Sequence, residues 1–182
     1  MTKSLIQQLH LGDYWDAQIV PAAKDAWSKI VCEKIQQREQ GRWRPSMSQR
    51  PKLRTYRRVK HNLVLENYLK SNDTAGRRAL ARIRSGTSEL RIESGRHNGE
   101  EVKDRMCWFG CGQLEDETHF LLDCYMYSDF RQDVIVEVGA DGFQQKGLNI
   151  MLCSDSEELI APVITFIKRS LARRRRVLQL RS

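Results

Sequence analysis

The spacing of hydrophobic residues along the chain predicts a mainly α-helical protein. In residues 21–40 the apolar side chains recur three or four positions apart, which gives one apolar helical face. Its members are Ala23, Ala26, Trp27, Ile30, Val31 and Ile35. Pro21 suits the first turn of this helix, where its missing N–H costs nothing, and Gly41 is expected to end the helix. Cys32 lies beside the apolar face and is interpreted as a buried free thiol.

Two further helices are predicted in the middle of the chain. Residues 59–69 form the first, and its candidate apolar side chains are Leu63, Leu65, Tyr68 and Leu69. The second runs over residues 74–86, with Thr74 as its expected N-cap and Gly86 as its end. Its inward-facing residues are expected to be Ala75, Ala79, Leu80 and Ile83, and its outward-facing ones Arg77, Arg78, Arg82 and Arg84.

The C-terminal part of the chain is predicted to contain more helix. Residues 115–138 are expected to form two helical pieces that meet at Cys124, with Gly139 and Gly142 breaking the pattern after them. A last helix begins near Ser156, whose hydroxyl can cap it, and its apolar face continues toward the C-terminus. The predicted fold is therefore a small helical domain.

The order of these elements predicts three parts. Residues 1–40 form an N-terminal helical segment, and residues 41–51 form a basic linker that contains two prolines. Residues 52–182 form the principal domain, which ends in a basic helix. A chain of 182 residues is long enough to bury a core of this size.

The net charge of +8 is unevenly distributed. Residues 41–105 contain 17 basic and 7 acidic side chains, residues 106–167 contain 2 basic and 11 acidic ones, and residues 168–182 contain 7 basic ones and no acidic one. This segregation indicates a surface that binds polyanions, and also internal pairing of the basic middle with the acidic segment. The alternative is that most of these charges simply solvate helix faces.

Composition narrows the class of protein. No stretch approaches the roughly 18–20 apolar residues that a membrane helix needs, and the N-terminus lacks the apolar run of a secretory signal. Five cysteines, three of them clustered, favour metal binding or free thiols in a reducing compartment over a disulfide scaffold. We therefore expect an intracellular protein of the nucleus or cytoplasm that is neither secreted nor bound to a membrane.

The strongest chemical signal is a cluster of possible metal ligands. Cys107, Cys111, His119 and Cys124 follow the pattern C-x3-C-x7-H-x4-C, and zinc prefers four sulfur or nitrogen ligands in a tetrahedron. Four protein ligands leave no position for water, so the predicted Zn²⁺ site is structural and staples the helical domain. The alternative is a chance grouping of buried cysteines with an exposed histidine. Cys153 lies outside this spacing and is interpreted as a core thiol.

The residues between these ligands fit a zinc knuckle. Gly110 and Gly112 can adopt the backbone conformations that a tight turn requires. If residues 117–123 are helical, His119 and Cys124 lie near one face and close the site from the other side.

Basic residues around the knuckle are candidates for nucleic-acid binding, because Arg and Lys neutralise phosphates and release counterions. Trp108 and Phe109 are candidates for stacking on unpaired bases, although Trp108 can equally pack over the zinc sulfurs. The acidic residues 115–117 oppose phosphate binding on their flank. The candidate arginines are Arg77, Arg78, Arg82, Arg84, Arg91, Arg96, Arg105, Arg173, Arg174, Arg175 and Arg176.

Catalysis finds no support in the sequence. The chain has no phosphate-binding loop, no nucleophile elbow and no H-E-x-x-H motif. We therefore expect a non-catalytic module that binds zinc and nucleic acid, either RNA or single-stranded DNA. The alternative from another class is a protein-interaction adaptor built on the zinc knuckle.

A resemblance agrees with this expectation. The knuckle spacing, LARIRSGTSELRIESGRHNG before it and LEDETHFLLDC at its end resemble the C-terminal zinc-knuckle region of non-LTR retrotransposon (long interspersed element) reverse-transcriptase polyproteins. The segments KLRTYRRVKHNLVLENYL and FIKRSLARRRRVL are similar to the same tail, so the resemblance covers about residues 52–180. It implies a region that holds RNA or target DNA beside a polymerase. This chain lacks the paired-aspartate polymerase motif and an endonuclease segment, so it would be a separate tail, either domesticated or a fragment without retained function.

Overall fold

The computed structural model describes residues 3–18, 23–153 and 156–180. The interpretation of Cys153 as a core thiol lies outside what is described. The chain divides into two compact units, residues 1–50 and residues 51–182, which are described separately. Both are helical, and no strand occurs in the described ranges. The expectation of a mainly α fold is confirmed.

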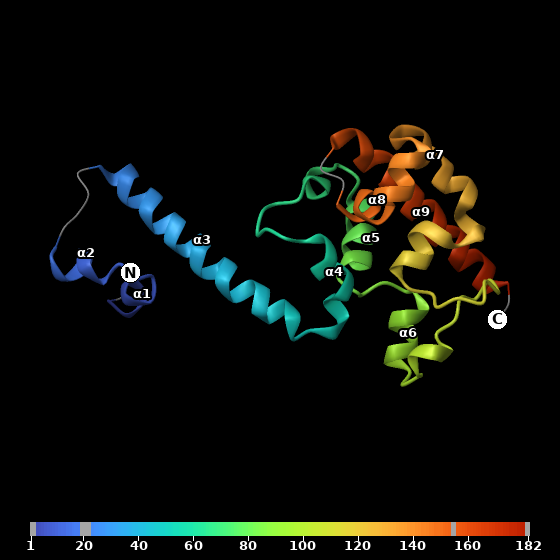
Figure 1. The fold of residues 1–182 in the computed structure, drawn as a ribbon, viewed down its shortest axis with the longest axis horizontal. Helices are drawn as coiled ribbons and strands as arrows, with labels where there is room; N and C mark the ends of the chain where they lie inside the picture. Colours follow the sequence, from blue (N-terminus) through green and yellow to red (C-terminus); the bar gives the residue numbers. More distant parts are fainter. Residues whose placement is uncertain (1–2, 19–22, 154–155, 181–182) are drawn as a thin grey trace. The chain divides into compact units, whose positions relative to one another are not determined.

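The first unit contains α1 (Lys3–Gln8), α2 (Gly12–Asp16) and α3 (Lys24–Ser48) (Figure 1). Its small core is formed by Ile6, Leu9, Leu11 and Val31, with Tyr14, Trp27 and Ile30 packed against it. The predicted start of the long helix at Pro21 lies outside the described residues. Cys32 is exposed, so its interpretation as a buried thiol is wrong.

Helix α3 is longer than expected. It continues through Gly41 and Pro45 to Ser48, so the prediction that Gly41 ends the helix and that a loop follows is wrong. A glycine inside a helix costs only about 1 kcal/mol, and the Glu, Gln and Arg residues on both sides of Gly41 favour helix. The boundary between the two units falls after Arg50.

The second unit packs its helices around α9. Its elements in chain order are η1 (Pro51–Leu53), α4 (Arg54–Val59), η2 (Asn67–Lys70), α5 (Thr74–Arg84), α6 (Arg91–His97), η3 (Val102–Asp104), η4 (His119–Asp123), η5 (Tyr125–Tyr127), α7 (Ser128–Val138), α8 (Ala140–Cys153) and α9 (Glu157–Gln179). Helix α9 lies along both α5 and α7 (Figure 1). It brings the C-terminal segment beside residues about 90 positions earlier in the chain.

The apolar face of α9 builds the core as its periodicity predicts. Val163, Ile164 and Ile167 are fully buried in a cluster that also contains residues of α5, of α7 and of the segment 107–124, which carries the clustered cysteines. At Gly76 a Cβ atom would lie 2.0 Å from Cγ2 of Ile164. Glycine at this position therefore permits the close approach of α5 to α9.

Several local predictions need correction. Residues 59–69 are not a helix, because α4 ends at Val59 and only the short η2 follows. Instead the backbone extends at Lys60, whose ammonium group pairs with Glu66 and also donates to the carbonyl of Val64. A buried charge that needs these partners bends the chain where an apolar pattern alone favours a helix.

Helix ends differ from expectation at three places. Asp73, not Thr74, caps α5, since its carboxylate accepts a hydrogen bond from the Gly76 N–H at 2.8 Å. Gly139 ends α7 as predicted, with φ of 76°. Gly142 does not interrupt the helix that follows, because it lies inside α8. Ser156 occupies the N-cap position of α9, as expected, but its hydroxyl makes no capping hydrogen bond. No described helix is long and apolar enough to cross a membrane.

Candidate metal centre

The four predicted metal ligands come together in the second unit. The ligand atoms of Cys107, Cys111, His119 and Cys124 all lie within 4.8 Å of one another. The sulfur atoms of Cys111 and Cys124 are 3.8 Å apart. Three of the four residues are buried and Cys111 is half-buried, so this group is shielded from solvent on most sides.

A short hairpin presents the first two cysteines. Met106 and Leu114 form an isolated antiparallel bridge, and the Cys107 N–H donates to the Gln113 carbonyl at 2.8 Å. The turn between them needs left-handed backbone at Gly110 (φ 76°) and Gly112 (φ 66°). Both glycines therefore serve the role that the sequence predicts for them.

A π-helical turn presents the other two ligands. The Cys124 N–H donates to the His119 carbonyl at 2.8 Å, an i to i+5 hydrogen bond. In an ordinary α-helix residues five apart are rotated by about 140° from each other. The wider π turn reduces that angle, so His119 and Cys124 both face the site. The sequence predicted helix here but not this widening.

The histidine is oriented for metal binding. Its Nδ1 lies 2.9 Å from Oε1 of Gln113, so Nδ1 carries the proton and donates it to this acceptor. Nε2 of His119 is buried and has no hydrogen-bond partner among the described residues. A buried lone pair without a partner is costly, and a metal ion bound at Nε2 would satisfy it. The residues thus fit a Cys3His metal site.

The thiols perturb each other's protonation. Hydrogen bonding from Cys124 lowers the pKa of Cys107 far below the usual thiol range, while the same contact raises the pKa of Cys124. Burial raises the pKa of Cys111, and the neighbouring Cys107 raises the pKa of His119. Without a metal, only one of the three cysteines is favoured as a thiolate. A divalent cation at the centre of the cluster would stabilise all three as thiolates.

The surroundings hold the π turn in place through residues that sequence reasoning missed. Arg131 is buried and donates from Nε to the Leu121 carbonyl at 2.8 Å and from Nη2 to the Cys124 carbonyl at 3.1 Å. The Tyr125 hydroxyl donates to the Phe109 carbonyl at 2.7 Å, which ties η5, just after the π turn, to the hairpin that carries Cys107 and Cys111. No motif marks these residues, since each acts on a backbone carbonyl.

The acidic segment beside the knuckle is neutralised inside the molecule. Glu115 is buried and accepts two hydrogen bonds from Arg174, at 3.0 and 2.9 Å. Glu117 is buried and accepts two from Arg54, both at 2.7 Å. Burial raises the pKa of Glu117 and Arg54 opposes this rise. The predicted internal pairing of basic and acidic segments is therefore confirmed, and these two carboxylates do not face solvent.

Three candidate nucleic-acid contacts are buried, so the prediction that they lie on a binding surface is wrong. Arg84 is only 1% exposed and pairs with Glu66 at 2.9 Å. Arg174 is held by Glu115, and Phe109 is 5% exposed with its ring edge-on to Tyr127. Apolar periodicity places Arg84 on the solvent side of α5, but the half-buried Glu66 draws it inward.

Most other candidate arginines have partners within the molecule. On α6, Arg91 pairs with Glu100 and Arg96 with Glu93. After α6, Arg105 donates to the carbonyls of Ile92 and Glu100. Elsewhere Arg77 donates to the Leu69 carbonyl, Arg173 pairs with Asp129 and Arg175 with Glu89. Each such pairing reduces the positive charge that the surface offers to a polyanion.

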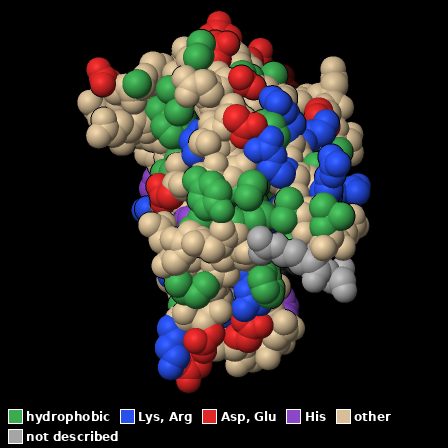
Figure 2. Space-filling view, turned by 90° about the vertical axis from the view of Figure 1, so that its right-hand side faces the viewer, with side chains coloured by type: hydrophobic (Ala, Val, Ile, Leu, Met, Phe, Trp, Pro, Cys, Tyr) green, Lys and Arg blue, Asp and Glu red, His purple; other side chains and the backbone are tan. Residues whose placement is uncertain are grey.

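Three candidate cations remain exposed without a partner among the described residues, namely Arg78, Arg82 and Arg176. Trp108 is 45% exposed, and the Arg91 guanidinium lies 4.6 Å from its ring centre. In Figure 2, Lys and Arg side chains lie among acidic and hydrophobic ones on the face shown, with no continuous basic surface.

Comparison with family models, with curated proteins and with solved structures finds no match to this chain.

Proposed function

We propose that the chain is a non-catalytic, zinc-stapled helical module that binds nucleic acid inside the cell. The observation that supports zinc best is the buried, unpartnered Nε2 of His119 beside three clustered thiols. Three thiolates and one imidazole are a usual ligand set of structural zinc sites. With four protein ligands the ion has no open position for a substrate, and its contribution is to hold the hairpin and the π turn together.

Metal analysis tests the zinc site. We expect one zinc ion per chain in protein purified without added metal, and loss of zinc in the His119→Ala variant. The matched control is Cys32→Ser, which removes an exposed thiol of the first unit and should leave the zinc content unchanged. A metal-free protein that still unfolds cooperatively at an unchanged temperature would contradict the proposal.

The unpaired cations support nucleic acid as the partner. Arg78 and Arg82 are four residues apart on α5, so they lie on the same side of the helix. Neither is neutralised by a described acidic residue. The resemblance to the zinc-knuckle tail of retrotransposon polyproteins points to the same class of partner, RNA or single-stranded DNA. Under this proposal the chain carries out the nucleic-acid-holding role of such a tail without a polymerase.

Parallel binding measurements test the partner. Fluorescence anisotropy of zinc-loaded protein with single-stranded RNA, single-stranded DNA and duplex DNA should show affinity that decreases steeply as salt increases. The double variant Arg78→Ala/Arg82→Ala should bind more weakly and with a smaller salt dependence. Absence of binding to all three at low salt would overturn this part of the proposal.

A protein partner is the second candidate, and an exposed apolar loop favours it. Leu63, Val64 and Leu65 are consecutive, and 48%, 67% and 68% of their surface is exposed. Neighbouring exposed apolar side chains are typical of protein interaction sites. The adaptor function predicts that Val64→Asp abolishes capture of a protein partner and leaves nucleic-acid affinity unchanged.

A further inference from the structure

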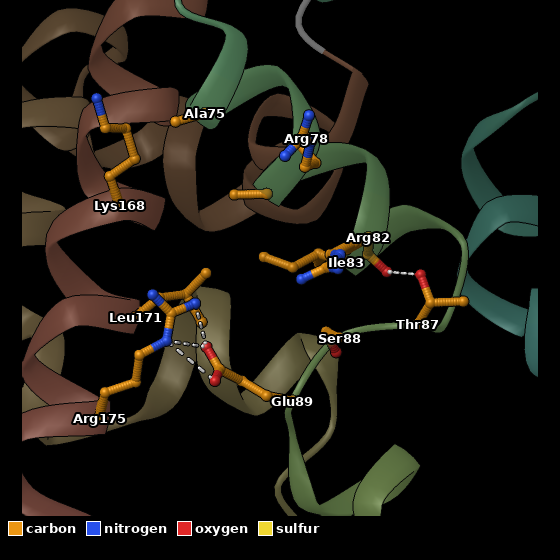
Figure 3. Close-up of a pocket in the computed structure, with 11 residues that line it drawn as sticks. Ala75, Arg78, Arg82, Ile83, Thr87, Ser88, Glu89, Lys168, Leu171 and Arg175 are labelled. Carbon is orange, nitrogen blue, oxygen red and sulfur yellow. Dashed lines mark hydrogen bonds and ion pairs between the residues drawn. The ribbon is translucent and has the colours of Figure 1, made fainter.

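A groove lies between α5 and α9 on the second unit, with a volume of about 490 Å³. Figure 3 shows its two walls, α5 with Arg78 and Arg82 on one side and α9 with Lys168, Leu171 and Arg175 on the other. The segment after α5 closes the end of the groove with Thr87, Ser88 and Glu89. This volume is in the range of small-ligand sites.

The lining combines an apolar part with a cationic part. The apolar surface is supplied by Ala75, Ala79, Ile83 and Leu171. The two alanines have short side chains, so they leave space along the α5 wall. Four basic side chains from the two helices surround it, and these are Arg78, Arg82, Lys168 and Arg175. A ligand that fits both parts carries an apolar portion with negative charges beside it.

The four cations are not equivalent. On α9, Lys168 is held by Asp73 at 2.7 Å and Arg175 by Glu89 at 2.8 Å. On α5, Arg78 and Arg82 have no partner among the described residues. Two anionic groups of a ligand can therefore bind along α5 without breaking an ion pair of the protein.

The wall of the groove also contains an unused polar group. The Ser88 hydroxyl is buried and has no hydrogen-bond partner in the described part of the chain. Such groups are uncommon in folded proteins. Because the protein covers this hydroxyl, it does not contribute to the ligand preference of the groove.

We propose that this groove holds one unstacked nucleotide of a single strand, with its base on the apolar lining and the flanking phosphates on Arg78 and Arg82. The proposal rests on the nucleic-acid function given above and names the class of nucleic acid. Guanidinium planes and apolar side chains both support unpaired bases, whereas the bases of a duplex are stacked inside and cannot enter a groove of this size. An acidic partner helix needs anchors over at least two turns, and the Ala75–Ile83 wall of about 12 Å spans only slightly more than two, so a direct competitor of that kind is included in the test below.

Binding of normal and abasic oligonucleotides to the full-length, zinc-loaded protein tests this inference. The probes are a fluorescent 12-nucleotide single strand, the same strand with abasic sites throughout, and a duplex of equal length. We expect the abasic strand to bind about 10-fold more weakly, in the range of the 1–3 kcal/mol that one stacked base contributes. The duplex should bind no better than the abasic strand.

Two variants separate the two parts of the groove. Ala79→Leu fills the apolar surface, so it should lower the affinity for the base-bearing strand and leave abasic binding unchanged. Arg78→Ala/Arg82→Ala should weaken both strands equally and decrease the slope of log affinity against log salt by about 1.4. The matched control is Arg58→Ala/Lys146→Ala, which removes two positive charges from a different hollow and should have little effect.

The outcomes distinguish failure of the nucleic-acid function from failure of the groove assignment alone. If no strand binds, the nucleic-acid function and the groove assignment both fail. If base-bearing and abasic strands bind equally, or Ala79→Leu has no effect while zinc content and unfolding temperature stay normal, only the groove assignment fails. Equally tight binding of polyglutamate of the same charge would overturn the assignment in favour of an acidic protein partner.

Discussion

Arg174 of the C-terminal helix α9 and Glu115 beside the knuckle form a buried ion pair across 59 residues of chain. Two hydrogen bonds, at 3.0 and 2.9 Å, join the guanidinium and the carboxylate. Glu115 also accepts the Arg91 N–H at 2.8 Å. The pair attaches the basic C-terminal segment to the acidic segment that follows Leu114.

Breaking this pair should destabilise the protein strongly. Glu115→Gln or Arg174→Met alone should each cost about 3–5 kcal/mol, because each leaves one charge buried without a partner. The double variant should cost less than the sum of the two, since neither charge then remains. Urea unfolding of zinc-loaded protein measures these values.

An exposed pair provides the control for this prediction. Lys103 and Glu101 are 2.8 Å apart, with 75% and 71% of their side chains exposed, and Lys103→Ala should change stability by less than about 1 kcal/mol. If the changes in the free energy of unfolding caused by the Glu115 and Arg174 substitutions were strictly additive, the two side chains would not interact. That result would contradict the prediction.

Gln113 should control the strength of metal binding without being a ligand. Its side-chain oxygen fixes the protonated Nδ1 of His119 and so directs Nε2 toward the thiols. Gln113→Ala should weaken zinc affinity by about 10–100-fold, as is usual for groups that orient a ligand. Competition with a chromophoric chelator measures the affinity, and Gln132→Ala on the exposed side of α7 is the control. An unchanged affinity would contradict the role of Gln113.

Substitution of Gly110 or Gly112 should destabilise the protein because of backbone conformation alone. A Cβ atom at Gly110 or Gly112 meets nothing within 4 Å, yet both residues have positive φ. Alanine at either position should destabilise the protein by about 1–2 kcal/mol. Gly142 also has free space but lies in α8 with ordinary φ, so Gly142→Ala should stabilise by about 0.5–1 kcal/mol. Thermal unfolding compares the variants, and equal effects would contradict the argument.

The Asp73 carboxylate should titrate below its usual range. The hydrogen bond from Lys168 lowers its pKa, and the capped Gly76 N–H lowers it further. Because the folded-state pKa is lower than the unfolded one, the carboxylate stabilises the fold above the ordinary pKa of about 3.9. That contribution disappears as the pH decreases through the folded-state pKa.

An NMR titration of the side-chain carboxyl carbon measures the pKa of Asp73. In Lys168→Ala it should increase toward its ordinary value. As a control, the pKa of Asp129, which Arg173 lowers in the same way, should not respond to this substitution. A wild-type pKa at or above the ordinary value would contradict the geometry.

Much of the candidate metal site could be predicted from sequence because its determinants are local. Four ligands lie within 18 residues, and the two glycines stand where the hairpin turns. The π turn at His119–Asp123 was beyond prediction, since its width depends on Arg131 and on packing from other helices. Gln113 was missed because a single amide near a cysteine cluster carries no signal of its own.

The sequence by itself determined the helical class, the core face of α9 and the cluster of candidate metal ligands, because these depend on periodicity and spacing over short stretches. Tertiary structure decided which charges are available to a partner. Arg84 and Arg174 follow the same local patterns as Arg78 and Arg82, but the half-buried Glu66 and the buried Glu115 draw the first two into the protein. A carboxylate that leaves water requires a cation nearby, and only the folded chain shows which arginine supplies it.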